Sequence, residues 1–237
     1  MEASVAEQRT ERIEFPSNEH TTPGYLAQPD DGASHPAIVV IQEWWGLVPH
    51  IEEVARRLSG EGFIALAPDL YHGHQAAEPD EARKLAMALE RDTAVAEILA
   101  AASYLADMER VEPKKIGVVG WCMGGGLALS AAAEDGDLGG VVAFYGRPLS
   151  ADDTARLHIP VLALYAEHDH SITADDIEAF EAAMAEHGVP HQVHTYAGTQ
   201  HAFFNDTRPG IYNPIAAADA WRRMLAWFRL HLSADPD

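Results

Sequence analysis

The segment Lys115-Ile116-Gly117-Val118-Val119-Gly120-Trp121-Cys122-Met123-Gly124-Gly125-Gly126 organises the rest of this chain. A short apolar run ends in Gly-x-Cys-x-Gly and leads into the Ala- and Leu-rich residues 127–133. This order predicts a strand over 116–119, then a tight turn, then a helix. Gly120 and Gly124 lie two residues before and after Cys122, where a side chain would collide with neighbouring backbone. We therefore expect Cys122 to stand on a strained turn above the end of a strand.

Cys122 has two interpretations. A single cysteine is most often a small buried residue that only fills space. A helix that begins directly after the cysteine, however, directs backbone N–H groups toward the sulfur and favours the thiolate over the thiol. The strand–turn–helix context favours this second interpretation, in which Cys122 is a nucleophile.

The composition limits the partners and the location of the protein. The 237 residues include 37 acidic and only 16 basic ones, and the resulting net charge of -21 argues against binding of nucleic acid or of an anionic membrane surface. No run of 18 apolar residues is present, so we expect no membrane span. The single cysteine excludes an intrachain disulfide, and residues 1–12 are polar and acidic rather than a secretory signal. We expect a cytoplasmic protein.

Strands and helices alternate along the chain, which predicts one doubly wound, mostly parallel sheet with helices on both faces. The chain opens with an expected antiparallel hairpin, and we predict a single α/β domain over 11–232 between disordered or frayed tails at 1–10 and 233–237. The predicted strands are 11–15, 24–28, 37–41, 63–67, 116–119, 141–145, 161–165 and 192–196. The predicted helices are 51–58, 81–105 with a break near Asp92-Thr93, 127–133, 174–186 and 215–232.

Four side chains that can act as nucleophile, acid or base follow the ends of predicted strands: Glu43, Cys122, Asp169 and His201. Functional groups collect outside the carboxyl ends of the strands in sheets of this kind. The order nucleophile, acid, histidine is that of the α/β-hydrolases. His201 is expected to take the thiol proton and later to activate water, while Asp169 fixes the tautomer of the imidazole.

Each of these assignments has a plainer alternative. His201 is one of thirteen histidines and could be a surface-loop residue, and Asp169 could be an ordinary turn residue. His168 and His170 flank Asp169 and suggest a metal site, but ligands at i and i+2 without a further clear partner make a poor one. We expect neither a metal nor a cofactor.

The oxyanion of an acyl-transfer reaction needs two backbone N–H groups. Met123, the residue after the nucleophile, is expected to supply one, and Trp44 the other. Trp45 and Tyr145 are expected to line the substrate pocket, although Trp45 could simply be packed. Glu43 is either a partner of the resting thiol or a structural carboxylate bonded to an arginine or to backbone.

Three motifs together resemble the dienelactone hydrolase family, the carboxymethylenebutenolidases: Gln42-Glu43-Trp44-Trp45-Gly46, Gly120-Trp121-Cys122-Met123-Gly124-Gly125 and His201-Ala202-Phe203. The resemblance extends from about Arg12 to Leu232. It implies a single-domain α/β-hydrolase fold, a Cys122–Asp169–His201 triad and a strand-end glutamate at Glu43.

One departure from the family concerns the substrate carboxylate. In the family members that act in chlorocatechol degradation, two arginines bind it, one of them a few residues after the catalytic histidine. That position lies near Asn205 in this chain. We expect Arg208 to substitute for it and Arg83 to correspond to the other arginine.

The chemistry of cysteine limits the substrates further. A thiolate also leaves easily, so the tetrahedral intermediate collapses backwards unless the other leaving group is comparably good. Activated lactones and esters such as enol lactones fit this requirement, and we predict their hydrolysis through a thioester by a monomer or small homo-oligomer. Two alternatives stay open: a general carboxylesterase or thioesterase on the same scaffold, and a non-catalytic or redox-sensing protein whose Cys122 is oxidised.

Overall fold

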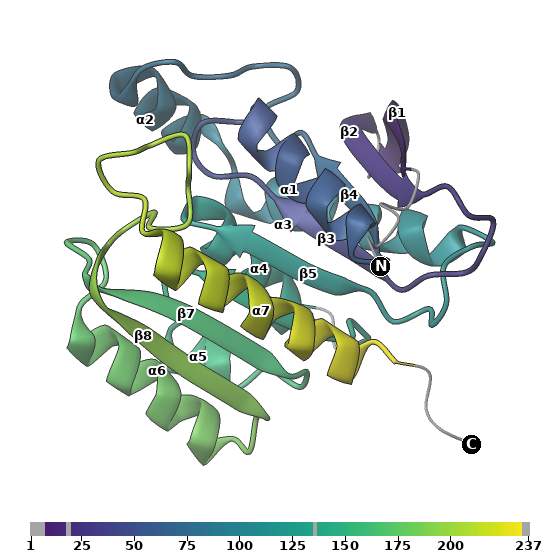
Figure 1. The fold of residues 1–237 in the computed structure, drawn as a ribbon. Helices are drawn as coiled ribbons and strands as arrows, with labels where there is room; N and C mark the ends of the chain where they lie inside the picture. Colours follow the sequence, from purple (N-terminus) through teal and green to yellow (C-terminus); the bar gives the residue numbers. More distant parts are fainter. Residues whose placement is uncertain (1–7, 18–19, 135–136, 234–237) are drawn as a thin grey trace, which may run out of the picture.

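The computed structural model of the protein describes residues 8–17, 20–134 and 137–233. An eight-stranded sheet in the order β1-β2-β4-β3-β5-β6-β7-β8 runs through the molecule, with helices on both faces (Figure 1). The pairs β1/β2 and β2/β4 are antiparallel, and the strands from β4 to β8 along the sheet are parallel. The predicted α/β fold with a mostly parallel sheet and an N-terminal hairpin is confirmed.

The strands are β1 (Gln8–Ser17), β2 (His20–Pro29), β3 (Ala37–Ile41), β4 (Ile64–Pro68), β5 (Gly117–Trp121), β6 (Gly140–Phe144), β7 (Val161–His168) and β8 (His191–Gln200). The helices are α1 (Pro49–Gly60), α2 (Pro79–Ala88), α3 (Arg91–Asp107), α4 (Met123–Glu134), α5 (Ala151–Thr154), α6 (Ala174–Glu186) and α7 (Pro214–His231).

The central strands are apolar at every position because both of their faces are covered. Val39 and Ile41 of β3 pack into a hydrophobic cluster with α3, α4 and α6. Ile38 and Val40 point to the opposite face, into a second cluster with α1 and α7. The sheet therefore separates two hydrophobic cores, and the rigid strands between them position the loops at their carboxyl ends.

Several element boundaries differ from the sequence prediction. The segment 81–105 forms two helices, but they separate at Leu89–Glu90, and Asp92 lies in the first turn of α3 instead of capping it. Strand β1 begins at Gln8, so residues 8–10 of the expected tail belong to the sheet, while residues 1–7 and 234–237 lie outside the described part of the chain. Helix α5 was not predicted, because a single capped turn is too short to show helical periodicity.

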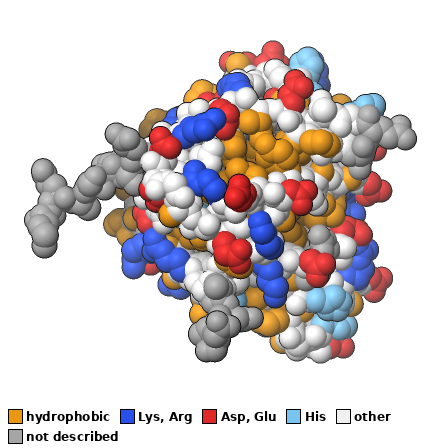
Figure 2. All heavy atoms as spheres, turned by 90° about the vertical axis from the view of Figure 1, so that its right-hand side faces the viewer, with side chains coloured by type: hydrophobic (Ala, Val, Ile, Leu, Met, Phe, Trp, Pro, Cys, Tyr) orange, Lys and Arg blue, Asp and Glu red, His pale blue; other side chains and the backbone are white. Residues whose placement is uncertain are grey.

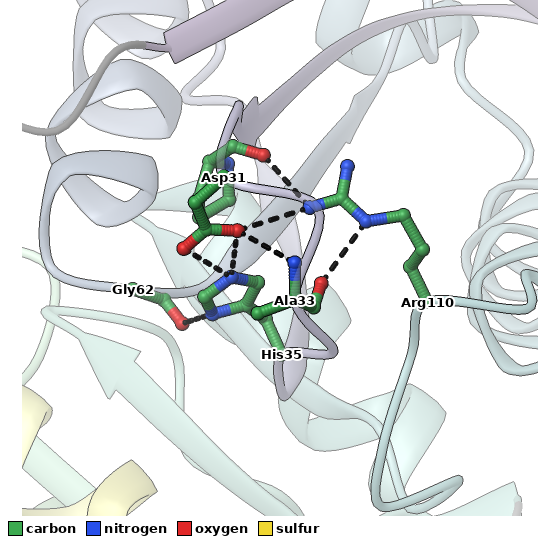
Figure 3. A network of polar contacts seen from close by, with 6 residues as sticks. Asp31, Ala33, His35, Gly62 and Arg110 are labelled. Carbon is green, nitrogen blue, oxygen red and sulfur yellow. Dashed lines mark hydrogen bonds and ion pairs between the residues drawn. The ribbon is translucent and has the colours of Figure 1, made fainter.

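The loop that leads into β3 is fixed by a polar network at the amino ends of the strands (Figure 3). The Arg110 guanidinium donates to the carbonyl oxygens of Pro29 and Ala33, at 3.0 Å each, and pairs with Asp31. The His35 ring lies between the Asp31 carboxylate, at 3.0 Å, and the carbonyl oxygen of Gly62, at 3.1 Å. These contacts set where β3 starts and so help to place Glu43 beyond its other end.

The face of the molecule drawn in Figure 2 carries no cluster of basic side chains. There, Lys and Arg side chains lie among Asp and Glu side chains, around a central area of hydrophobic ones. No helix of the described residues has the length and apolar character needed to cross a membrane.

Candidate active site

Cys122 occupies a left-handed turn between β5 and α4. Its φ of +57° is uncommon for a residue with a side chain. The Cys122 N–H donates to the carbonyl oxygen of Phe144 at 3.0 Å, and the Cys122 carbonyl accepts from the Gly125 N–H at 3.0 Å. The side chain is half-buried and contacts the core on the α1 and α7 side. A strained, well-anchored backbone thus presents the thiol at the carboxyl edge of the sheet.

The two glycines around Cys122 are required by close backbone approach. A Cβ atom on Gly120 would lie 2.0 Å from the carbonyl oxygen of Gly124. A Cβ atom on Gly124 would lie 2.3 Å from the carbonyl oxygen of Gln42. The structure therefore accounts for both flanking glycines by the collision that the sequence predicts.

His201 and Asp169 meet beyond the ends of β8 and β7. The distance from His201 Nδ1 to Asp169 Oδ2 is 2.6 Å. Asp169 also accepts hydrogen bonds from the N–H and the hydroxyl of Ser171, at 2.8 and 2.7 Å, and its side chain is buried. Burial by itself would raise the pKa of Asp169, but these donors outweigh it and lower the pKa. Asp169 is therefore an ionised acceptor that holds one nitrogen of the imidazole.

His201 lies between Asp169 and the thiol. Burial lowers the pKa of His201, but the hydrogen bonds to Asp169 and Cys122, with the charges of both partners, raise it to about 10. The imidazolium is therefore favoured at neutral pH, next to the sulfur. The ring also contacts Tyr145, with 4.9 Å between the ring centroids.

Glu43 is a buried carboxylate held by two neutral donors. Its Oε1 accepts from the Tyr145 hydroxyl at 3.3 Å, and its Oε2 accepts from the Asn205 amide at 2.6 Å. Burial and the charge of Glu43 raise the pKa of Tyr145 well above its usual value, so the phenol stays protonated. Both oxygens of Glu43 are thus engaged, which favours its interpretation as a structural carboxylate, although its partners are neither an arginine nor backbone.

Trp44 and Met123 each present a backbone N–H with no acceptor among the described residues. The carbonyl oxygen of Glu43 accepts from the Gly46 N–H at 3.3 Å in a tight turn. That bond directs the Trp44 N–H, in the same peptide group, away from the turn. Met123 is the first residue of α4, where backbone N–H groups have no partner within the helix. Both groups are available for an oxyanion.

Tyr71 connects the two residues that carry these N–H groups. Its hydroxyl lies 3.2 Å from the carbonyl oxygen of Trp44 and 3.4 Å from the sulfur of Met123. Burial and the nearby Cys122 raise the pKa of Tyr71, so this hydroxyl is a donor throughout the physiological range. The side chain is buried and contacts both sides of the candidate oxyanion site.

Trp45 and Arg208 line a depression of about 470 Å³ beside this centre. The Arg208 guanidinium lies 5.6 Å from the centre of the Trp45 ring. The remaining lining residues are Val48, Pro49, His50, Ala76, Ala77, Asn205 and Thr207. Both Trp45 and Arg208 are thus in reach of a molecule bound near Glu43.

Arg83 is not brought to the other candidate residues. It lies on α2 with 65% of its side chain exposed and pairs with Asp80 at 3.6 Å. His168 and His170 do not form a ligand set with Asp169, since the described residues contain no group of three side chains suited to hold a metal.

Sequence reasoning missed three residues that the fold brings to the centre: Tyr71, Ser171 and the amide of Asn205. Tyr71 follows the carboxyl end of β4, and this position is the feature of the sequence that could have identified it as a site residue. Asn205 enters the sequence analysis only as the position near which other family members have a carboxylate-binding arginine. Its bond to Glu43 spans 162 residues of sequence, which no local pattern reveals.

Comparison with known proteins gives concordant results. Residues 22–232 match the model of the family described as "Dienelactone hydrolase family". The chain is 35% identical to "Protein usf" of Aquifex pyrophilus and 33% identical to a protein of Aquifex aeolicus named "Putative carboxymethylenebutenolidase"; each match covers 93% of this chain and 98% of the relative. It is also similar to the crystal structure of a "Putative Dienelactone Hydrolase" from Klebsiella pneumoniae, with a TM-score of 0.87, 29% identity and coverage of 94% and 98%.

Proposed function

Since the chain belongs to the dienelactone hydrolase family and is a hydrolase of that type, we propose that it hydrolyses activated lactones and esters through a thioester on Cys122. The observation that carries this proposal is the short Asp169–His201 bond with the thiol on the other side of the imidazole. In this arrangement His201 exchanges a proton with the sulfur while Asp169 fixes the ring.

In the acylation step, the Cys122 thiolate attacks the carbonyl carbon of the substrate. The oxyanion that forms accepts hydrogen bonds from the N–H groups of Met123 and Trp44. The intermediate collapses with cleavage of the bond to the alcohol oxygen, and the His201 imidazolium protonates that oxygen as it leaves. An enolate or phenolate leaves more readily than an alkoxide, which is why activated substrates are favoured over alkyl esters.

Deacylation uses the same histidine as a base. Thioester formation removes the negative charge and the hydrogen bond of the thiolate, two of the causes that raise the pKa of His201. The neutral imidazole then becomes accessible and takes a proton from water, whose oxygen attacks the thioester carbonyl. The carboxylic acid is released, and the Cys122–His201 pair is restored.

The other site residues receive supporting roles in this proposal. Glu43 holds Tyr145 and Asn205 in place around His201 and the pocket. Trp45 and Arg208 bind the part of the substrate that enters the adjacent depression, and Tyr145 forms a wall of the site beside the imidazole.

Tyr71 is a positioning residue in this scheme, and its removal gives a specific expectation. Tyr71→Phe loses one hydrogen bond that fixes Trp44 and Met123, so kcat is expected to fall roughly three- to tenfold with a smaller change in KM. Steady-state kinetics with an aryl ester checks this. The matched control is Tyr165→Phe, because the buried Tyr165 hydroxyl has no hydrogen-bond partner in the described structure. A purely structural role of the Tyr71 hydroxyl would lower the stability of Tyr71→Phe without a selective loss of kcat, whereas Tyr165→Phe should leave both quantities unchanged.

The proposed function is tested by trapping the intermediate. The enzyme is mixed with 4-nitrophenyl acetate, quenched in acid and digested with a protease. The mass of the peptide that contains Cys122 is then measured by mass spectrometry. We expect one added acetyl group on Cys122, and we expect alkylation of Cys122 by iodoacetamide to abolish turnover. Turnover that survives complete alkylation, or acylation of a different residue, contradicts the proposal. A parallel assay with an enol lactone decides between lactone hydrolysis and a general esterase.

A further inference from the structure

The pairing of the arginines is uneven in this acidic protein. Most of them contact a carboxylate, as expected where acidic residues outnumber basic ones by 37 to 16. Among the described residues, no ion pair is formed by Arg57, Arg91, Arg147 or Arg208. Arg57 lies over the Trp221 ring at 4.0 Å, and Arg208 lies over Trp45. In the described part of the chain, no aromatic ring lies under Arg91 or Arg147, so these two arginines need a different explanation.

Arg91 and Arg147 line the same depression, of about 440 Å³, beside the first turns of α4. Met123, the residue after Cys122, forms part of its wall. The apolar part of the lining also includes Ala86, Leu89, Leu127 and Leu149. The depression shares no lining residue with the one formed by Trp45 and Arg208. The two depressions therefore have separate linings, and Met123 is the residue of the first that belongs to the candidate catalytic centre.

Arg91 is anchored on α4, and the backbone of Arg147 lies beside the first turn of that helix. The Nε and Nη2 groups of Arg91 donate to the Ser130 hydroxyl at 3.3 and 3.1 Å, and that hydroxyl donates to the carbonyl oxygen of Gly126 at 2.9 Å. The backbone of Arg147 runs past Gly126, where a Cβ atom would meet its N and O atoms at 3.5 and 3.6 Å. Both side chains are exposed, so their remaining N–H groups are free to bind an anion.

The nearby carboxylates already have partners. Asp153 also lines the depression, but it accepts from the Ser150 hydroxyl at 2.9 Å and pairs with Arg156 at 3.6 Å. Hydrogen bonds from the hydroxyl and the N–H of Thr173 lower the pKa of Asp176, and the charge of Arg147 adds a smaller contribution in the same direction. Neither carboxylate forms an ion pair with Arg91 or Arg147.

We propose that this depression is a subsite for a substrate arm that consists of an apolar spacer and a terminal carboxylate. The inference rests on the proposed function, because it assumes that the substrate carbonyl reacts at Cys122. The apolar lining binds the spacer, and the guanidinium groups of Arg91 and Arg147 bind the anion through charge-assisted hydrogen bonds. The subsite selects, among activated esters, those that carry a carboxylate several carbon atoms from the scissile bond.

Two pairs of esters test the proposal. 4-Nitrophenyl hydrogen adipate and methyl 4-nitrophenyl adipate place the carboxylate or its neutral methyl ester on the acyl part. 4-(Carboxymethyl)phenyl hexanoate and its methyl ester place them on the leaving group. The quantity measured is the ratio of kcat/KM for the anionic ester to kcat/KM for its neutral partner, at low ionic strength, where exposed charges are least screened.

For at least one pair we expect a ratio above one that falls roughly tenfold in Arg91→Gln or Arg147→Gln and also falls with added salt. The responding pair identifies which half of the substrate occupies the subsite. Arg229→Gln, which breaks an ion pair with Glu61 at the far end of α7, controls for the change in net charge. Ratios that do not respond to either substitution overturn the subsite, while hydrolysis of the neutral esters still supports the proposed function. Failure to hydrolyse any of the four esters would instead count against the proposed function itself.

Discussion

Replacing Cys122 with alanine is expected to lower kcat/KM for activated esters by roughly four powers of ten or more. The Cys122 sulfur is the only protein atom that forms a covalent bond to the substrate in the proposed mechanism, so none of the other groups can replace it. The remaining N–H groups and His201 still bind and polarise a carbonyl, which leaves a small residual rate above that of water. The measurement is steady-state kinetics of the variant beside the wild type, with an enol lactone and with 4-nitrophenyl acetate.

The same variant is expected to fold normally. Cys122 is half-buried and its thiol contributes little packing area, so the free energy of unfolding should change by less than about 1 kcal/mol. Urea unfolding checks this and separates loss of the nucleophile from loss of structure. Normal turnover by a fully folded Cys122→Ala protein would remove Cys122 from the mechanism and leave the redox-sensing hypothesis as the better interpretation of this cysteine.

Replacing Gly120 with alanine is expected to destabilise the protein by about 4 kcal/mol or more, the largest stability effect that we predict. The added Cβ atom would lie 2.0 Å from the carbonyl oxygen of Gly124 and 2.3 Å from the carbonyl carbon. Both atoms belong to backbone in the first turn of α4, and therefore neither can move aside without shifting the nucleophile turn. Such a cost is a large fraction of the stability of a typical domain, so the variant should unfold at much lower urea concentration or not accumulate at all.

Gly126→Ala is the matched control for this substitution. A Cβ atom at Gly126 would meet the backbone of Arg147 at 3.5 Å, which is ordinary van der Waals contact. Alanine also has the higher helix propensity, so this variant should be within about 1 kcal/mol of the wild type. If the two substitutions cost equally, close backbone approach is not the reason for glycine at position 120.

Much of the fold follows from local patterns in the chain. Continuous apolar runs predict β3 to β7 because a strand covered on both faces cannot alternate with polar residues. The boundary errors have equally physical causes. Near Leu89–Glu90 the helical spacing continues through the break, so the sequence suggests an N-cap at Asp92, whereas α3 begins at Arg91 after Glu90, which makes no side-chain cap bond.

The candidate site is predictable only where a backbone requirement leaves a local signature. Cys122 between Gly120 and Gly124 is such a case, and strand-end positions identify Asp169, His201 and Glu43 as residues that the fold can bring to one edge. The family resemblance predicts Arg83 as the second arginine for a substrate carboxylate, but the structure puts it on an exposed helix face with Asp80. Tyr71 also follows a strand end, but no motif around it distinguishes a tyrosine with a role in the site from an ordinary loop residue.

The strained turn at Cys122, with the strand before it and the helix after it, is predictable from the chain, because steric limits on the backbone act over a few residues. The succession of nucleophile, acid and histidine can also be read directly from the sequence. The partners of Glu43 are decided by tertiary structure alone: Tyr145 is 102 residues away and Asn205 is 162. The same holds for the hydroxyl of Tyr71, which joins Trp44 to Met123, and for the two arginines that share one depression. Contacts between distant loops depend on how the sheet and its helices assemble. The periodicity of apolar residues predicts the helices and strands themselves, but it does not predict which loops meet.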